Sequence, residues 1–347
     1  MRSFDYIEEA ISCIDYDIVN LLIQIHERNV YLKCLLKSDK YDFSDFAKQA
    51  QRESVISSNR MEYAFFNEKS VGRVIEDNQP WGSKEMEICG YNSALESTFK
   101  AERPHRIEDF HYLNEHFEKY DEDHREFRIR DRNYTFYKGY KNEKDILTLE
   151  PVDFNDIDKY IDLISNPSFS YMWNDKVDFL LVLPICILDF IKIYPLRKNS
   201  MQMSRLLMNA MLWGKCYPIV KYVSIERLIE ENENEYYQAI ADSLAEWEYG
   251  LNNYKPFVKY ILNILLKAYK EFDKRIEYII YESMNKAERV EYYILNSKTE
   301  VTKKEIMYYC PDISETMIEA TLSKLLKSGV IEKVSGGRYT RYKYKRN

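Results

Sequence analysis

The chain contains the sequence Ile193-Tyr194-Pro195-Leu196-Arg197-Lys198-Asn199-Ser200-Met201-Gln202-Met203-Ser204-Arg205-Leu206-Leu207-Met208-Asn209. Apolar residues at helical spacing precede it over residues 177–193, and a second helical pattern covers residues 204–212. Gly214 ends the second pattern, as glycine commonly does just past a helix. The quoted sequence is therefore expected to hold a loop between two helices, the first of them buried.

This loop resembles the signature of the Fic family (Fic/Doc, or Fido), which reads H-P-F-x-[DE]-G-N-G-R-x-x-R. The length agrees without a gap, and Pro195 and Arg205 are identical to the signature. Residues 91–96, 206–209 and 217–237 are also similar to segments of Fic proteins. The resemblance covers roughly residues 45–245. It implies a mainly α fold, in which a Fic helical core carries a small β-hairpin flap.

The positions that carry the family's chemistry differ in this chain. Fic enzymes usually move AMP from ATP to a protein hydroxyl, a reaction called adenylylation or AMPylation. A histidine takes the proton, an acidic residue holds Mg²⁺, Gly-Asn-Gly cradles phosphate, and two arginines hold the distal phosphates. The corresponding residues here are Tyr194, Lys198, Asn199-Ser200-Met201, Gln202 and Arg205.

These replacements oppose catalysis for physical reasons. A tyrosine with a pKa near 10 is only about 0.1% phenolate at neutral pH, so Tyr194 is a poor general base. Lys198 repels a cation, so we expect no metal site and no Mg²⁺. Ser200 and Met201 carry Cβ atoms that hinder a tight phosphate nest. No catalytic residue of the signature is therefore intact at Tyr194, Lys198 or Gln202.

Binding of a nucleotide or another anion stays open, because Lys198 could attract phosphate without a metal. ATP is the candidate ligand. The resemblance places the candidate nucleotide or anion contacts at Asn199, Ser200, Met201, Arg205, Tyr236 and Tyr237. The alternative for the tyrosine pair is ordinary packing of a helix, and the helix N-terminal amides near Met201 would favour an anion in either case.

A second motif lies upstream, within an expected helix over residues 43–65. Ser58 and Glu62 fit the inhibitory helix of Fic proteins, [ST]-x-x-x-E-[GN], although Tyr63 stands where Gly or Asn is expected. In inhibited Fic proteins this glutamate pairs with the second arginine. The resemblance therefore implies a Glu62–Arg205 ion pair, against the alternative that both are exposed helical residues.

A β-hairpin is expected between residues 130 and 149, turning near residues 139–144. In Fic proteins a hairpin here is the flap that holds the target protein, so a protein target at 130–149 is implied. The alternative is an ordinary surface hairpin. Upstream, one helix is expected over residues 4–28 and a loop over residues 78–89.

The C-terminal end resembles a winged helix. Thr302 and Glu305 fit a capping box, Ser314 begins a second helix, and two strands flank residues 335–337. DNA contacts would come from Thr316, Arg338, Arg341 and Lys343. The acidic start of the second helix opposes tight major-groove binding, so a protein-interaction module is the alternative.

Composition limits the setting of the chain. The formal charge is −7, but residues 323–347 carry eight basic residues and one acid, which leaves −14 for the rest. The six cysteines show no C-x-x-C pair, which favours a reducing cytoplasm and opposes zinc ligation. No apolar signal region begins the chain, and the apolar run at 179–188 is too short for a bilayer. We expect a cytoplasmic homo-oligomer without membrane contact.

Together these features predict four parts: an N-terminal helical segment with the inhibitory-helix-like motif (1–75), the Fic core (76–245), a connecting helix (246–289) and the winged helix (290–347). The preferred function is a catalytically impaired or inactive Fic-fold protein acting in regulation or protein interaction. One alternative is a divergent AMP transferase using ATP on a protein hydroxyl. The other is a winged-helix DNA-binding transcriptional regulator. Whether the chain is an enzyme is left open.

Overall fold

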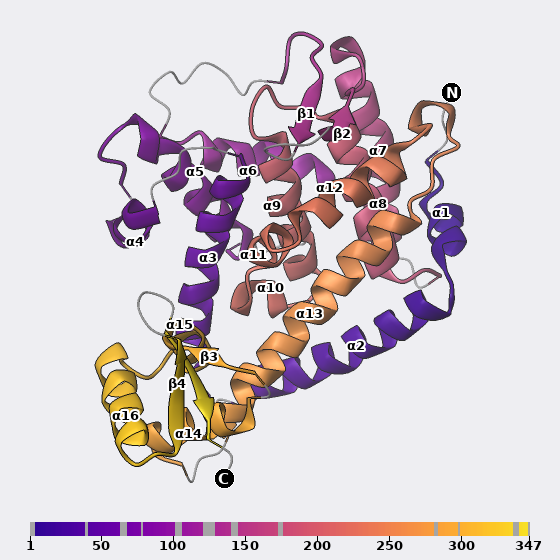
Figure 1. The fold of residues 1–347 in the computed structure, drawn as a ribbon. Coiled ribbons are helices and arrows are strands. Elements are labelled where there is room, and N and C mark those ends of the chain that lie inside the picture. Colours follow the sequence, from indigo (N-terminus) through magenta and orange to yellow (C-terminus); the bar gives the residue numbers. More distant parts are fainter. Residues whose placement is uncertain are drawn as a thin grey trace. The chain divides into compact units, whose positions relative to one another are not determined.

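The computed structural model in Figure 1 describes residues 4–38, 41–62, 68–77, 79–100, 106–120, 129–139, 145–172, 176–280, 284–297, 299–335 and 340–345. The chain packs into two compact units. Unit 1 comprises residues 1–41 and 50–268, and unit 2 comprises residues 42–49 and 269–347. The predicted four-part division stays a prediction, since packing alone does not test it.

Helices make up most of the described chain, as the predicted mainly α class requires. Unit 1 contains α1 (Tyr6–Cys13), α2 (Tyr16–Lys37), α4 (Glu68–Asp77), α5 (Ser83–Thr98), η1 (Ile107–Asp109), α6 (Phe110–Phe117), β1 (Phe136–Gly139), β2 (Asp145–Leu149), η2 (Phe154–Asp156), α7 (Ile157–Met172), α8 (Phe179–Ile193), α9 (Ser200–Gly214), α10 (Ile219–Tyr222), α11 (Ile225–Glu230), α12 (Glu233–Leu244) and η3 (Trp247–Tyr249). Two longer helices, α3 (Ser44–Glu62) and α13 (Lys255–Ile280), have residues in both units.

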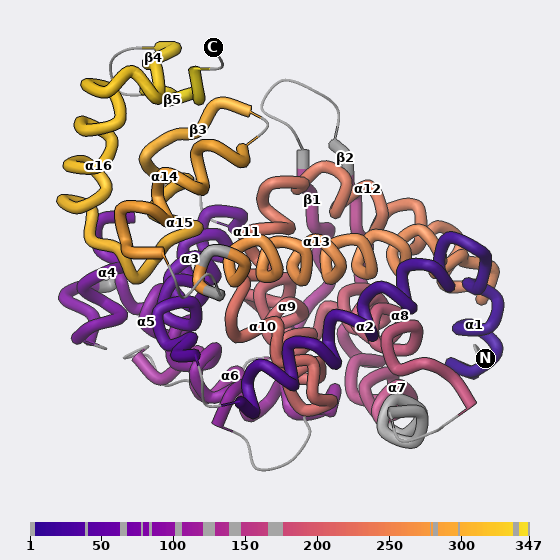
Figure 2. Tube along the Cα trace, turned by 90° about the horizontal axis from the view of Figure 1, so that it is seen from below, coloured from indigo at the N-terminus to yellow at the C-terminus, as the bar shows by residue number. Residues whose placement is uncertain are grey.

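The core of unit 1 is built on α8 and α9. Every residue of α8 is buried, and α9 is buried from Ser200 to Leu212. A helix that is apolar all round can only be stable when other elements cover it completely. Figure 2 shows α2 and the first part of α13 running side by side, and ion pairs Lys255–Asp15 (2.8 Å) and Lys259–Asp17 (2.6 Å) join them. Among the described residues, no helix is long and apolar enough to cross a membrane.

The prediction of one continuous helix over residues 4–28 is wrong, because the chain forms two helices, α1 and α2, with a break between them. The chain leaves helical geometry at Ile14, which is extended, and α2 starts again at Tyr16. The carboxylate of Asp15 accepts the N–H of Ile18 at 2.8 Å, which satisfies an otherwise unpaired donor of the new helix. The helical spacing of the apolar residues continues across this N-cap, so the spacing alone did not reveal the break between the helices.

The loop predicted over residues 78–89 is also too long. Helix α5 begins at Ser83, because the Glu85 carboxylate accepts the N–H of Trp81 at 2.8 Å and closes the first turn. Residues 91–96 therefore lie within α5 instead of at its start. Gly90 on this helix faces the carbonyl of Phe117, where an added Cβ would come within 1.9 Å, so α5 and α6 pack closely only through glycine.

The predicted hairpin is present. Strands β1 and β2 pair antiparallel, with Phe136 opposite Leu149 and Lys138 opposite Leu147. Residues 140–144, which make up most of the predicted turn, lie outside the described residues.

Unit 2 has the element order expected at the C-terminal end. It contains α14 (Lys286–Asn296), β3 (Val301–Thr302), α15 (Lys303–Tyr309), α16 (Glu315–Lys327), β4 (Ile331–Ser335) and β5 (Arg341–Tyr344). The strands form an antiparallel sheet in the order β3-β5-β4. Thr302 and Glu305 form the predicted capping box, and Gly329 ends α16 with φ +72°. Ile306, Ile318 and Leu322 lie in the core of this unit.

A buried carboxylate joins distant parts of unit 1. Asp189 on α8 accepts hydrogen bonds from Tyr6 (2.9 Å), from the indole N–H of Trp247 (2.7 Å) and from Tyr254 (2.7 Å). Leu188 and Phe190 flank it on α8, and three donors from elsewhere in the sequence satisfy it.

We expect Asp189→Ala to lower the free energy of unfolding by about 3 kcal/mol or more, because three buried donors lose their acceptor. Urea denaturation followed by circular dichroism measures the change. Asp162→Ala, at an exposed position of α7, is the control and should stay within about 0.5 kcal/mol of wild type. Equal effects of the two substitutions would contradict the role of Asp189.

Candidate functional site

The signature-like loop lies between α8 and α9, as predicted. The residue at each end of the loop has a left-handed backbone conformation. Tyr194 has φ +49° and ψ +62°, and Asn199 has φ +65° and ψ +12°. Asparagine adopts this geometry readily, but tyrosine does so rarely. The loop therefore has a glycine-like conformation at a position with a large side chain, and other groups must hold it there.

Arg130 is the group that holds the first half of the loop. Its guanidinium donates to the carbonyls of Tyr194 (2.9 Å), Ile193 (3.2 Å) and Val152. Its own N–H donates to the carbonyl of Pro195 at 2.9 Å. Sequence reasoning missed Arg130, since a lone arginine before a predicted hairpin has no distinguishing pattern.

The second half of the loop is closed by Ser200. Its hydroxyl accepts the N–H of Leu196 (3.0 Å) and donates to the carbonyl of the same residue (3.1 Å). Tyr134 also donates to that carbonyl at 3.1 Å. Ser200 and Met201, at the positions that hold phosphate in the signature, are both buried.

Tyr194 occupies the position of the signature histidine and packs as an apolar ring. Tyr194 is 6% exposed. Its ring packs against Tyr134, just before β1, and against Phe136, the first residue of β1, at centroid distances of 5.7 Å (edge-on) and 5.6 Å. Burial, with the nearby Glu62 carboxylate second, raises the pKa of Tyr194 far above its ordinary value. The phenolate is therefore even rarer than in water.

Arg205 and Glu62 form the predicted ion pair, at 2.8 Å from Nη2 to Oε1. Nη2 also donates to the hydroxyl of Ser58 at 3.2 Å. Arg205 is 1% exposed, so the alternative that it is an exposed helical residue is wrong. Burial is the largest effect and opposes its charge, but the Glu62 carboxylate and the neighbouring tyrosines Tyr236, Tyr237 and Tyr91 together outweigh it and raise the pKa of Arg205 above its ordinary range. The inhibitory role of Ser58 and Glu62 stays a prediction.

Part of the Arg205 guanidinium remains without a hydrogen bond. Its Nε and Nη1 are buried and make none of normal geometry to the described residues. The same holds for Oε1 of Gln202 and for the hydroxyl of Tyr237. Buried polar atoms of this kind usually have water or an ion as their partner.

The hairpin is fastened across this site by Lys138 of β1. Its ammonium donates to the carbonyl of Met61 at the end of α3, and lies 2.9 Å from Glu233 of α12. It also lies 5.1 Å from the ring centroid of Tyr237. Tyr236 and Tyr237, the predicted nucleotide contacts, are both buried and pack edge-on at 5.2 Å.

A buried carboxylate that sequence reasoning missed ties α3 to the rest of the site. Glu226 of α11 accepts from Ser54 (2.7 Å), Tyr91 (2.7 Å) and the side-chain amide of Asn209 (2.7 Å). A surface position on a short helix is the ordinary expectation for glutamate, so only the packing of α3, α5 and α9 around it reveals this role.

The expectation that this loop binds no Mg²⁺ stays a prediction. Lys198 is exposed, and among the described residues no three His, Cys, Asp or Glu side chains gather as metal ligands. The donor set therefore does not fit Mg²⁺, which prefers carboxylate oxygens.

In unit 2, Thr316, Arg341 and Lys343 are exposed, whereas Arg338 lies outside the described residues. Lys303 pairs with Glu315 and Glu319, both at 2.7 Å. These ion pairs offset part of the acidity of α16 that argued against DNA.

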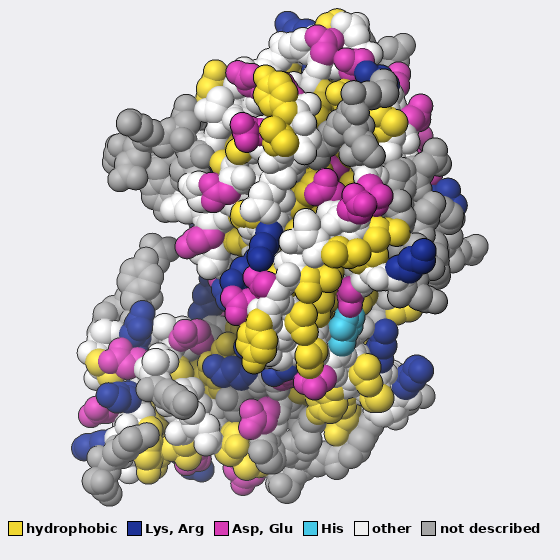
Figure 3. All heavy atoms as spheres, turned by 90° about the vertical axis from the view of Figure 1, so that its right-hand side faces the viewer, with side chains coloured by type: hydrophobic (Ala, Val, Ile, Leu, Met, Phe, Trp, Pro, Cys, Tyr) yellow, Lys and Arg dark blue, Asp and Glu magenta, His cyan; other side chains and the backbone are white. Residues whose placement is uncertain are grey.

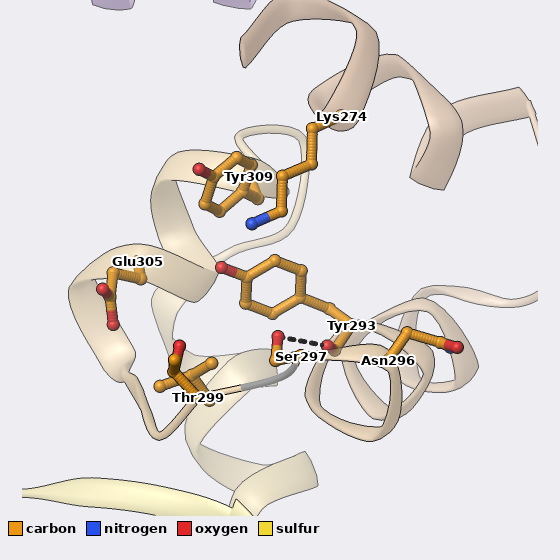
Figure 4. Close-up of a pocket in the computed structure, with 8 residues that line it drawn as sticks. Lys274, Tyr293, Asn296, Ser297, Thr299, Glu305 and Tyr309 are labelled. Atoms are coloured by element: carbon orange, nitrogen blue, oxygen red, sulfur yellow. Dashed lines mark hydrogen bonds between the residues drawn. The ribbon is translucent and has the colours of Figure 1, made fainter. Parts of the chain in front are cut away.

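Unit 2 also contains a cavity of about 350 Å³. Figure 4 shows Lys274 extending toward the rings of Tyr293 and Tyr309, and its ammonium lies 5.6 Å and 4.5 Å from their centroids. Glu305, on the opposite wall, caps α15 through Thr302. Both charged groups of the cavity thus have local partners, and the cavity by itself indicates no ligand.

Comparison with solved structures identifies the fold. A Fic family protein of Desulfovibrio desulfuricans G20 is similar with a TM-score of 0.61 at 16% identity, over 96% of this chain and 97% of that one. A Fic domain-containing signaling protein of Bacteroides thetaiotaomicron gives 0.54 at 15% identity, over 74% and 94%. Residues 134–508 of Fic-1 from C. elegans give 0.51 at 13% identity, over 75% and 73%.

No protein-family model and no curated protein matches the sequence. The structural likenesses nevertheless agree with one another, and the chain has the Fic fold that its sequence predicted.

The Glu62–Arg205 pair predicts a large coupling energy. We expect Glu62→Gln to lower the free energy of unfolding by about 3 kcal/mol, because a buried guanidinium loses its counterion. Adding Arg205→Met should recover part of that loss, giving a coupling of about 2 kcal/mol in a double-mutant cycle. Urea denaturation of the four proteins measures it, with Glu76→Gln on the exposed face of α4 as control. Additive effects would show that the pair contributes nothing.

Proposed function

We propose that this chain is a Fic-fold protein that has lost adenylylation chemistry and acts in regulation or protein interaction. The burial of Tyr194 between Tyr134 and Phe136 carries the proposal. A general base must exchange a proton near neutral pH and reach the attacking hydroxyl. A buried phenol with a strongly raised pKa does neither.

The remaining positions support the same proposal. Lys198 supplies no oxygen for a metal, and the hydroxyl of Ser200 is committed to the backbone of Leu196. Loop amides that would meet a phosphate are covered by Ser200 and Met201, both buried. For AMP transfer, Lys198, Ser200 and Met201 would all have to adopt other positions at the same time.

Anion binding is the activity that the side chains still favour. The Nε and Nη1 of Arg205 make no hydrogen bond of normal geometry to the described residues, and its Nη2 pairs with Glu62. An anion and the Glu62 carboxylate would compete for this guanidinium, since two negative charges cannot share one buried cation cheaply. We therefore propose that phosphate groups of ATP bind at Arg205 only when Glu62 is displaced.

With radiolabelled ATP and Mg²⁺ or Mn²⁺, we expect no incorporation of AMP into the protein, for wild type and for Glu62→Gly alike. The reason is the missing base, which releasing α3 does not restore. Autoradiography after denaturing electrophoresis measures the label. Clear labelling of either protein, abolished by Tyr194→Phe, would overturn the proposal that the chemistry is lost.

Ligand binding is tested separately in metal-free buffer. ATP should raise the Tm of Glu62→Gly measurably and that of wild type little, because only the variant has an unopposed Arg205. The shift should disappear in Glu62→Gly/Arg205→Met. An equal shift in all three proteins would place any ATP site elsewhere.

A second candidate function rests on unit 2. We infer that its helices and three-stranded sheet form a winged helix that contacts DNA. Arg341 and Lys343 alternate along β5 and are exposed, so both lie on one face of the strand. The pairing of Lys303 with Glu315 and Glu319 supports this reading, because it lowers the repulsion between α16 and phosphate.

For this function, Arg341→Ala should weaken binding to duplex DNA to a similar extent for all sequences. It should also reduce the dependence of log K on log salt by about 1, since one phosphate contact is lost. Fluorescence anisotropy over a salt series measures both quantities. Lys176→Ala, a change of a described basic residue in unit 1, is the control. Absence of salt-dependent binding by wild type would remove the DNA candidate.

A further inference from the structure

The outward face of α1 and α2 is unusually apolar. Of the sixteen exposed large hydrophobic side chains among the described residues, seven lie within residues 11–31. They are Ile11, Ile14, Tyr16, Val19, Ile23, Val30 and Tyr31, which we call the α2 band. Figure 3 shows hydrophobic side chains gathered in a band on the side of the molecule where α1 and α2 lie in Figure 1. Monomeric proteins seldom leave so continuous a patch in water.

The α2 band cannot be buried by rotating the helix. The opposite face of α2 packs inward through Ile18, Leu21, Ile25 and Leu32. Asn29 donates to the carbonyl of Cys216 at 3.2 Å, and His26 lies 2.6 Å from Asp178. These contacts fix the orientation of α2, so turning the helix about its axis does not bury the band.

The spacing of the α2 band fits another helix. Tyr16, Ile23 and Val30 are seven residues apart, and Val19 lies between the first two at the complementary position. This is the repeat with which one helix packs along a second helix. The stretch from 16 to 30 is about 21 Å long at 1.5 Å per residue, which suffices for a helix pair.

Charge selects the partner. Residues 4–17 contain five acidic residues and no basic one, whereas residues 28–37 contain three basic residues and no acidic one. Lys255 and Lys259 already face Asp15 and Asp17, so the acidic excess rests mainly on residues 5–9. If a two-fold axis perpendicular to α2 relates the chain to a second copy, the two α2 helices run antiparallel. Each acidic end then lies beside the other copy's basic end. A parallel copy would place like charges together.

We propose that the α2 band is a homodimer interface in which α2 pairs antiparallel with α2 of a second copy. Ile23 is midway between Tyr16 and Val30, so it lies at the two-fold axis. Tyr16 of one copy then packs against Val30 and Tyr31 of the other. The exposed Cys34 lies eleven residues from the axis, so antiparallel pairing puts it beyond the start of the other copy's α2 instead of beside its own counterpart.

Sedimentation equilibrium of the full chain over a concentration series tests the proposal. Wild type should dimerise, and Ile23→Asp should raise the dimer Kd by about tenfold or more, because two carboxylates would meet at the axis. Leu251→Asp, which changes an equally exposed residue outside the band, is the control and should leave Kd unchanged. A Tm for Ile23→Asp close to that of wild type shows that the variant is folded.

Cross-linking tests the direction of the pair. Under mild oxidation, Ile23→Cys with Cys34→Ser should form a disulfide-linked dimer, whereas wild type should form none through Cys34. Raising the salt concentration should weaken the wild-type dimer, since unlike charges face each other. A wild type that stays monomeric at all concentrations, a dimer that Ile23→Asp leaves intact, or a Cys34–Cys34 link would each overturn the proposal.

Discussion

The positive charge of Arg205 is removed from water, and a charge in that position is tolerable only beside a counterion. Glu62, the last residue of α3, is that counterion. The electrostatic requirement of one side chain on α9 therefore decides where the end of α3 lies. Lys138 then fastens β1 to the neighbouring carbonyl of Met61. The hairpin, α3 and α9 thus meet at one buried pair.

Polar contacts along the rest of α3 also hold this helix in place. Ser54 donates to Glu226, Glu53 pairs with Arg227 at 2.9 Å, and Arg60 pairs with Glu230 at 2.7 Å. The last of these is partly exposed, and such pairs contribute little by themselves. The buried Ser54–Glu226 contact matters more, because Glu226 needs every one of its donors inside the protein. The contacts of Ser54 with Glu226 and of Glu62 with Arg205 therefore hold this part of α3 in place at both of its ends.

Prediction from the sequence succeeded where motifs resemble a known family. The resemblance of the loop and its flanks to Fic proteins was enough for the fold, and the resemblance of Ser58 and Glu62 to the inhibitory helix was enough for the ion pair. Prediction failed where a single side chain overrides a pattern, as Asp15 does within the first helix. It also missed Arg130, Asp189 and Glu226, whose partners come from segments far apart in the sequence. No local pattern distinguishes a buried carboxylate from an exposed one before the fold is known.

The residues of the loop differ in how far their neighbours satisfy them. Tyr194 and Ser200 are satisfied by their neighbours, the first by aromatic packing and the second by the backbone of Leu196. Two nitrogens of Arg205, Nε and Nη1, make no hydrogen bond of normal geometry to the described residues. An anion that bound there would have to weaken the Glu62 contact. By reciprocity, anything that pulls α3 from α9 would strengthen anion binding by the same factor. Anion binding as proposed at Arg205 would therefore couple the position of α3 to the presence of a charged ligand.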